Sequence, residues 1–128
     1  MLTHQFRELT AYLHEFNELQ LDRLRGVCCE GVRASSFLCE LVRRFVDEEH
    51  VRRYGRHEPV HYISVREQPA PLLERAASEA REVATRVGAE APDRLTAAEL
   101  LPLSVFLEQL SARLEACLPA APWGQGAA

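Results

Sequence analysis

Apolar residues recur every three or four positions over long stretches of this 128-residue chain, and this spacing limits its fold more than any other feature. Side chains spaced in this way lie on one face of an amphipathic helix. The first such stretch covers residues 3–25, and we expect the helix to end at Gly26. Its stripe consists of Phe6, Leu9, Leu13 and Phe16, continued by Leu19 or Gln20 and by Leu24.

Two more helices are predicted in the middle of the chain. The second has Ser35 or Ser36 as its cap and ends at Gly55, and two adjacent apolar rows give it a broad buried face. The third begins at Pro71, since proline suits the first helical position, and ends at Gly88. Its apolar face is mostly alanine, which buries little area, so we expect this helix at the edge of the core.

A fourth helix is predicted to open at the sequence Thr96-Ala-Ala-Glu99. This is the pattern of a capping box, in which the threonine hydroxyl and the glutamate carboxylate each satisfy a free backbone N–H. Pro102 follows and lacks an N–H, so it predicts either a kink or a fresh helix start. Prolines and glycines are frequent after residue 118, and we expect one helical domain over 1–118 and a flexible tail over 119–128.

The pattern changes between the second and the third helix. Residues 60–66 are rich in β-branched and aromatic side chains and lie between Pro59 and Pro69, which predicts one short extended segment. A single strand has unpaired backbone groups on both edges, so it must pair with another chain or lie across the helices. The predicted fold is an all-α bundle of about four helices with this one extended segment.

Two features of this predicted fold indicate a homodimer. The first helix, at about 23 residues, would be roughly 35 Å long, whereas a compact domain of this size is about 26 Å wide. A second copy of the chain covers the excess length and gives the extended segment a partner. The residues expected at this interface are Phe6, Leu9, Leu13, Phe16, Tyr62 and Ile63.

All fifteen basic residues are arginine, and nineteen acidic residues give a net charge of −4. A mildly acidic surface repels phosphate backbones, so nucleic acid is not the expected partner. Residues 50–57 are the exception, because Arg52, Arg53 and Arg56 occur there without an acid among them. These three arginines are a candidate anion-binding site. The alternative is a solvated helix end whose cations complement the helix dipole.

The start of the chain does not resemble a signal peptide, because it contains an acid and two histidines within fifteen residues and no unbroken apolar run. The longest largely apolar run, residues 100–107, is far shorter than the roughly 20 residues that span a membrane. We therefore expect a cytoplasmic protein with no membrane partner. Its cysteines are then expected to be reduced. They are Cys28, Cys29, Cys39 and Cys117.

One stretch, His57-Glu-Pro-Val-His61, matches the letters of a zinc-protease motif that works only on a helix. Pro59 does not fit inside such a helix, and an extended chain separates the two histidines by about 13 Å, too far to share a metal. The cysteine spacing is not that of a structural zinc site, and no nucleophile or phosphate-loop motif occurs. We expect no enzyme activity, no catalytic or metal-binding residue and no cofactor.

These exclusions favour a non-enzymatic interaction protein: a small acidic helical adaptor, regulator or secretion-chaperone-like protein that binds itself and another protein. One alternative is a ligand- or metal-binding helical module that uses Cys28, Cys29 and the region from His50 to His61. A second alternative is a nucleic-acid-binding regulator that acts through the three arginines of residues 50–57.

Overall fold

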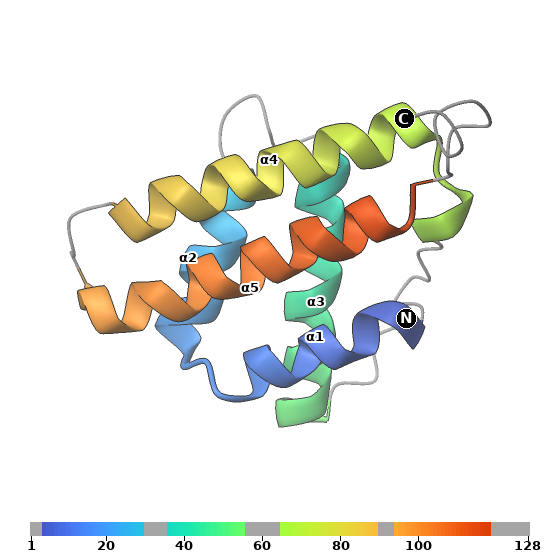
Figure 1. The fold of residues 1–128 in the computed structure, drawn as a ribbon. Coiled ribbons are helices and arrows are strands. Elements are labelled where there is room, and N and C mark those ends of the chain that lie inside the picture. Colours follow the sequence, from blue (N-terminus) through green and yellow to red (C-terminus); the bar gives the residue numbers. More distant parts are fainter. Residues whose placement is uncertain (1–3, 30–35, 56–64, 90–93, 119–128) are drawn as a thin grey trace.

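A computed structural model gives the fold and describes residues 4–29, 36–55, 65–89 and 94–118 (Figure 1). Within these ranges the chain is helical and contains no strand, which confirms the predicted all-α class. None of the described helices has both the length and the apolar character of a membrane span. The elements are α1 (His4–His14), α2 (Glu18–Cys29), α3 (Phe37–Tyr54), the short 3-10 turn η2 (Val65–Glu67), α4 (Ala70–Ala89) and α5 (Ala97–Ala116).

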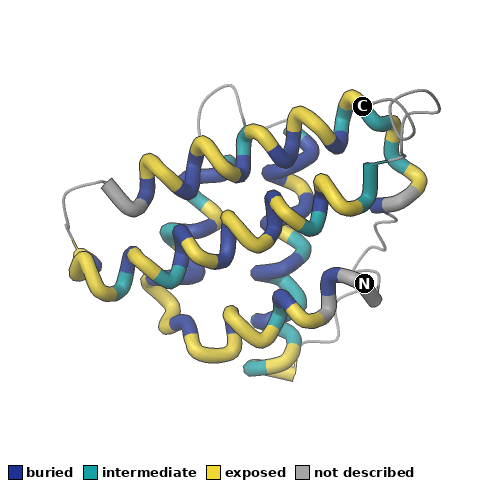
Figure 2. Tube along the Cα trace, in the orientation of Figure 1, coloured by how far each residue is buried: buried dark blue, intermediate teal, exposed yellow. Residues whose placement is uncertain are grey.

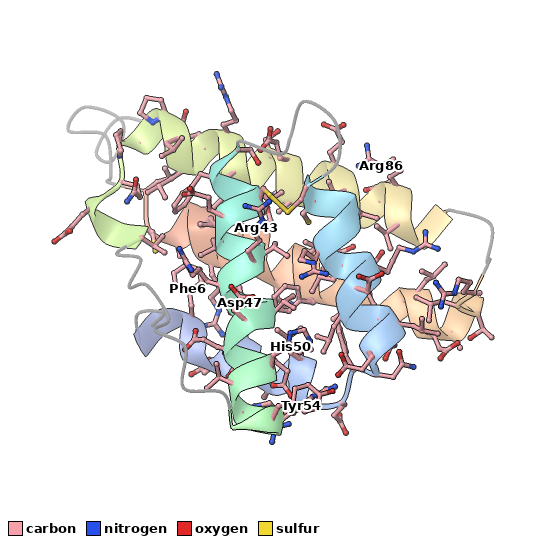
Figure 3. All side chains as sticks on the ribbon, turned by 180° about the vertical axis from the view of Figure 1, so that it is seen from behind. Phe6, Arg43, Asp47, His50, Tyr54 and Arg86 are labelled. Atoms are coloured by element: carbon pink, nitrogen blue, oxygen red, sulfur yellow. A yellow bond between two sulfur atoms is a disulfide. The ribbon has the colours of Figure 1, made fainter. Side chains whose placement is uncertain are left out.

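The helices form two layers. Helices α4, α5 and α1 lie side by side in one layer, with α5 in the middle, while α2 and α3 cross behind them (Figures 1 and 3). The core lies between the layers, where the Phe45 ring of α3 meets the Phe106 ring of α5 edge to face, with centroids 5.2 Å apart. Within the described ranges, five helices in two crossed layers thus replace the simple bundle of about four that the sequence predicts.

The predicted single helix over residues 3–25 is wrong, because the chain breaks into α1 and α2. Asn17 is the cause. Its Oδ1 accepts a hydrogen bond from the Gln20 N–H at 2.8 Å, and Gln20 Oε1 accepts one from the Asn17 N–H at 2.8 Å. This reciprocal pair is a capping box that starts a new helix. Gly26, the predicted helix end, lies inside α2.

The helix break removes one reason to expect a homodimer, since α1 has 11 residues and α2 has 12. Each is about 17 Å long and fits within the width of one domain. The apolar stripe of α1 also faces the interior of the same chain (Figure 2). Its three residues, together with Phe16 just after the helix, are at most 4% exposed: Phe6, Leu9, Leu13 and Phe16.

The predicted extended segment over residues 60–66 can be compared with the structure only at its end, because residues 60–64 lie outside the described ranges. At residues 65 and 66 the prediction is wrong. Val65 begins the η2 turn and is fully buried rather than extended. The predicted end of the preceding helix is confirmed, because Gly55 has a left-handed φ of 62° and donates its N–H to the Val51 carbonyl at 2.9 Å.

Helix α5 begins at the predicted capping box and runs without interruption through Pro102. The Glu99 N–H donates to Thr96 Oγ1 at 3.2 Å, and the Thr96 N–H donates to Glu99 Oε1 at 2.9 Å. Of the two predicted outcomes at Pro102, the fresh helix start is wrong, and the kink stays a prediction. The carbonyl that this proline leaves without a donor belongs to Ala98, four residues earlier, which is exposed and can accept from water.

Helix α4 lies at the outer edge of its layer, as its alanine face predicts, and packs tightly against α5 (Figure 1). Two buried serines of α5 point at the α4 backbone. Ser111 Oγ donates to the Ala77 carbonyl at 2.7 Å, and Ser104 Oγ donates to the Ala84 carbonyl. Small side chains on both helices permit this close approach, and the hydroxyls need no other partner.

Replacement of Ser111 by leucine tests how tightly α4 and α5 pack. Ser111→Leu inserts a larger side chain at a fully buried position and removes a hydrogen bond. We expect it to lower the free energy of unfolding by about 1–3 kcal/mol in urea denaturation. The control is Ala112→Leu at the exposed neighbouring position, where we expect a change within about 0.5 kcal/mol. Equal effects of both variants would contradict tight packing at Ser111.

Candidate functional site

The end of α3 reaches the junction between α1 and α2, and Arg53 connects the three helices there. Its Nη2 donates to the carbonyl oxygens of Leu13, at 2.8 Å, and of Phe16. Its Nη1 donates to Glu18 Oε2 at 2.9 Å. The guanidinium therefore adds a donor to the Leu13 carbonyl, which also accepts the Phe16 N–H, supplies one to the Phe16 carbonyl after α1, and binds the first residue of α2.

Glu49 is the buried anion beside Arg53, with only 2% of its side chain exposed. It accepts hydrogen bonds from Arg53 Nε at 2.5 Å and from Arg52 Nη2 at 2.7 Å, and His14 Nε2 lies 3.6 Å away. Burial acts to raise the pKa of Glu49, but the hydrogen bonds and charges of the two arginines outweigh it and lower the pKa. Glu49 is thus held as a carboxylate.

Glu18 adds an outer part to this cluster. It accepts from the Tyr54 hydroxyl at 2.6 Å and lies 3.2 Å from His50 Nε2. The Tyr54 hydrogen bond is the largest influence on the pKa of Glu18, and together with Arg53 and His50 it lowers that pKa against a smaller effect of burial. We call Glu18, Glu49, Arg52, Arg53 and Tyr54 the Arg53 cluster.

The Arg53 cluster changes the interpretation of the predicted anion-binding site. Arg52 and Arg53 both bind carboxylates of their own chain, while Arg56 lies outside the described residues. The acids come from just outside the basic stretch: Glu49 precedes it by one residue, and Glu18 is brought in by the fold. The spacings i, i+3 and i, i+4 from Glu49 to the arginines were visible in the sequence and are typical of helical ion pairs.

Substitution of Arg53 measures what the cluster contributes to stability. Arg53→Gln leaves Glu49 buried with one cation fewer and removes a donor from the Leu13 and Phe16 carbonyls, so we expect a loss of about 3 kcal/mol in the free energy of unfolding. Arg52→Gln is the control, because that side chain is 49% exposed. We expect about 1 kcal/mol or less for it. Urea denaturation measures both, and similar losses would show that Arg53 has no special role.

The lowered pKa values predict how stability depends on pH. Glu49 and Glu18 have folded pKa values below 4.5, so their stabilising effect is present above that pH and is lost as the pH falls through the lower folded values. Urea denaturation over a pH series is expected to show this loss. The slope is expected to be smaller in Glu49→Gln and unchanged in Glu108→Gln, a control on the exposed face of α5. An unchanged slope in Glu49→Gln would contradict the assignment.

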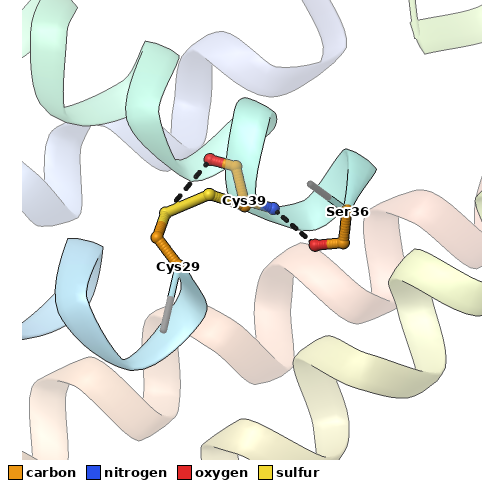
Figure 4. The surroundings of a disulfide bond; sticks show 3 residues. All are labelled: Cys29, Ser36 and Cys39. Carbon is orange, nitrogen blue, oxygen red and sulfur yellow. Dashed lines mark hydrogen bonds between the residues drawn. A yellow bond between two sulfur atoms is a disulfide. The ribbon is translucent and has the colours of Figure 1, made fainter. Parts of the chain in front are cut away.

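A second polar feature lies where the end of α2 meets α3. Cys29 and Cys39 form a disulfide, so the expected reduced state is wrong for these two residues (Figure 4). The fold brings their Cα atoms within 4.9 Å across ten residues of sequence, which no spacing rule reveals. Cys28 and Cys117 take no part in a disulfide, and Cys28 is buried as part of the core.

An open groove of about 350 Å³ lies beside this disulfide. We call it the cysteine groove; its lining residues come from α2 and α3 and include the disulfide-bonded Cys29. Sequence reasoning singled out Cys29 only as one of two adjacent cysteines and missed the groove, because its walls are distant in sequence. The lining residues are Asp22, Arg25, Gly26, Cys29 and Arg43.

The remaining candidate residues are not brought together. Cys28 is buried, and His50 pairs with Glu18, while His57 and His61 lie outside the described residues. In the ranges that the structure describes, no three histidine, cysteine or acidic side chains gather closely enough to hold a metal ion. Of the proposed interface, three residues of α1 and Phe16 just after it belong to the core, and the other two, at positions 62 and 63, fall outside the described ranges.

No protein-family model, no curated protein and no solved structure matches this chain.

Proposed function

We propose that this protein is a non-enzymatic interaction protein that binds another protein through the outward side of α5 next to α1. The observation that carries the proposal is an exposed apolar surface there. Leu101 is 61% exposed and Val105 is 38% exposed, and their spacing of four residues places them on one side of α5. An exposed apolar group on a small helical domain favours a binding role.

Tyr12 of α1 extends this surface. It is 37% exposed, and its ring meets Phe106 edge to face with centroids 6.4 Å apart, which places it beside the residue after Val105. Helix α1 runs antiparallel to α5, because Glu8 binds Arg113 at 2.6 Å and Asn17, beyond the end of α1, binds Glu99 at 3.0 Å. We call Tyr12, Leu101 and Val105 the α5 face.

Charge around the α5 face indicates what it binds. Glu108 follows Val105 by one helical turn, and Glu8 precedes Tyr12 by one turn; both are exposed. Together with the net charge of −4, these acids favour a partner with an apolar anchor and a basic rim. A partner of this kind suits an adaptor, regulator or secretion-chaperone-like protein.

The polar groups of the chain support a role without catalysis. In the Arg53 cluster, the arginines and carboxylates bind one another and the ends of helices, and Glu49 is almost fully buried. Catalytic acids and bases need to reach a substrate within hydrogen-bonding distance. The groups of this cluster are instead held by the fold in hydrogen bonds and ion pairs with one another.

Affinity capture from cells of the source organism, with quantitative mass spectrometry, tests the proposal. Leu101→Glu places a charge in the α5 face, and we expect it to reduce recovery of the bound protein by about tenfold or more, since buried anchors dominate binding. The control is Leu19→Glu on α2, which introduces the same charge at an exposed leucine of the other layer (Figure 1). This control is expected to recover the partner as the unaltered protein does.

Equal recovery with Leu101→Glu and the unaltered protein would overturn the proposal for the α5 face. A homodimer is a special case, in which the second copy is the partner. Sedimentation velocity of the same purified variants tests it. We expect a dimer that Leu101→Glu dissociates and Leu19→Glu preserves, whereas a monomer at all concentrations would exclude self-association and leave another protein as the partner.

A further inference from the structure

The two sulfur atoms of the disulfide differ in how far they can be approached. Cys39 is fully buried, whereas Cys29 is half-buried and lines the cysteine groove. A nucleophile needs a path to the sulfur that it attacks. A small molecule in the groove therefore meets the Cys29 sulfur first.

The helix ends give the two sulfurs different properties as well. Cys39 is in the first turn of α3, where its N–H donates to the Ser36 cap at 3.0 Å (Figure 4). Cys29 is the last residue of α2. A helix dipole stabilises an anion at the N-terminal end and disfavours one at the C-terminal end. Cys39 is accordingly the better leaving thiolate, and Cys29 is better suited to remain in a covalent bond.

The charges of the cysteine groove favour an anionic ligand. Arg25 of α2 and Arg43 of α3 line the groove together with Cys29, and Asp22 is the one acid among the lining residues. Asp22 binds Arg25 at 3.2 Å. Arg43 forms no ion pair with any described residue, is exposed, and has its charge available to a ligand.

We propose that Cys29 is a thiol–disulfide exchange site for small thiols that carry carboxylates. The incoming thiolate attacks Cys29 Sγ and forms a mixed disulfide, while the Cys29–Cys39 bond breaks and its electron pair leaves with Cys39 as a thiolate. The incoming sulfur and Cys29 are joined by the new bond, and no other oxidant or reductant takes part. The arginines of the groove hold the carboxylates of the thiol.

The inference goes beyond the binding role of the α5 face, because it concerns another pair of helices and a covalent step. Of the two adjacent cysteines, it assigns a role to Cys29 alone. Cys28 is buried and is not among the lining residues of the groove. The two proposals can therefore fail independently.

The experiment uses Cys39→Ala, which leaves Cys29 as a free thiol that can be modified without re-forming the native disulfide. The probes are oxidised glutathione, which carries carboxylates, and cystamine, which is cationic. Mass spectrometry follows the rate of adduct formation, and peptide mapping locates the adduct. The ratio of the two rates in the unfolded protein corrects for the intrinsic reactivity of the probes.

We expect the folded protein to react with oxidised glutathione in preference to cystamine by about tenfold more than the unfolded protein does, because exposed charges give effects of this size. We expect this preference to be lost at high salt, which screens the charges. Arg25→Gln with Arg43→Gln is expected to abolish the preference. Arg86→Gln on α4, outside the groove, is the matched control and is expected to keep it. Circular dichroism confirms that each variant is folded.

A parallel measurement uses the native disulfide. Oxidised protein is treated with reduced glutathione, quenched with acid, alkylated in denaturant and mapped. We expect glutathione on Cys29 and the alkyl group on Cys39. The proposal would be overturned if glutathione were found on Cys39 instead. It would also be overturned if folded and unfolded Cys39→Ala gave the same probe ratio, or if the two arginine substitutions had no effect. Four free thiols in the oxidised, denatured protein would show that the disulfide does not form and would overturn it as well.

Discussion

The Arg53 guanidinium is the interaction on which the rest of the structure depends. Helix α1 has 11 residues, too few for a stable helix in isolation, and its C-terminal carbonyls need donors. Arg53 of α3 adds one at the Leu13 carbonyl and binds the start of α2 in the same contact. Three helices meet at one planar guanidinium, which can donate several hydrogen bonds in fixed directions at once. The ammonium group of a lysine donates hydrogen bonds with a less defined geometry. Because the cation is desolvated, the buried Glu49 carboxylate beside it is required as well.

The sequence predicts a part of this fold correctly because the signals are local. The apolar stripes place residues such as Phe45 and Leu13 in the core, and the caps at Ser36, Thr96 and Gly55 are formed by neighbouring residues. Each of these depends on contacts within about one helical turn. The boundary at Asn17 was also local, but the continuing apolar spacing concealed it, and a three-residue interruption hardly disturbs a helical period.

The candidate sites were harder to predict because their parts come from different helices. Glu18 lies 35 residues from Arg53, and the cysteine groove needs both α2 and α3. A count of acids within residues 50–57 suggested free arginines, although the partner carboxylates lay outside that window. The cysteines were predicted to be reduced because a cytoplasmic protein was expected. Only the fold shows that Cys29 and Cys39 are close enough to form a disulfide.

The order of the helices in space differs from their order along the chain, and this affects synthesis. Helix α1 packs against α5, and the bond between Glu8 and Arg113 joins residues 105 positions apart. A ribosome that adds about 5–20 residues per second completes α1 several seconds before its packing partner exists. During that interval the phenylalanines and leucines of α1 have no native surface to cover them. The nascent chain thus exposes the apolar stripe of α1 early, and the cell has to tolerate or shield that segment until the last helix emerges.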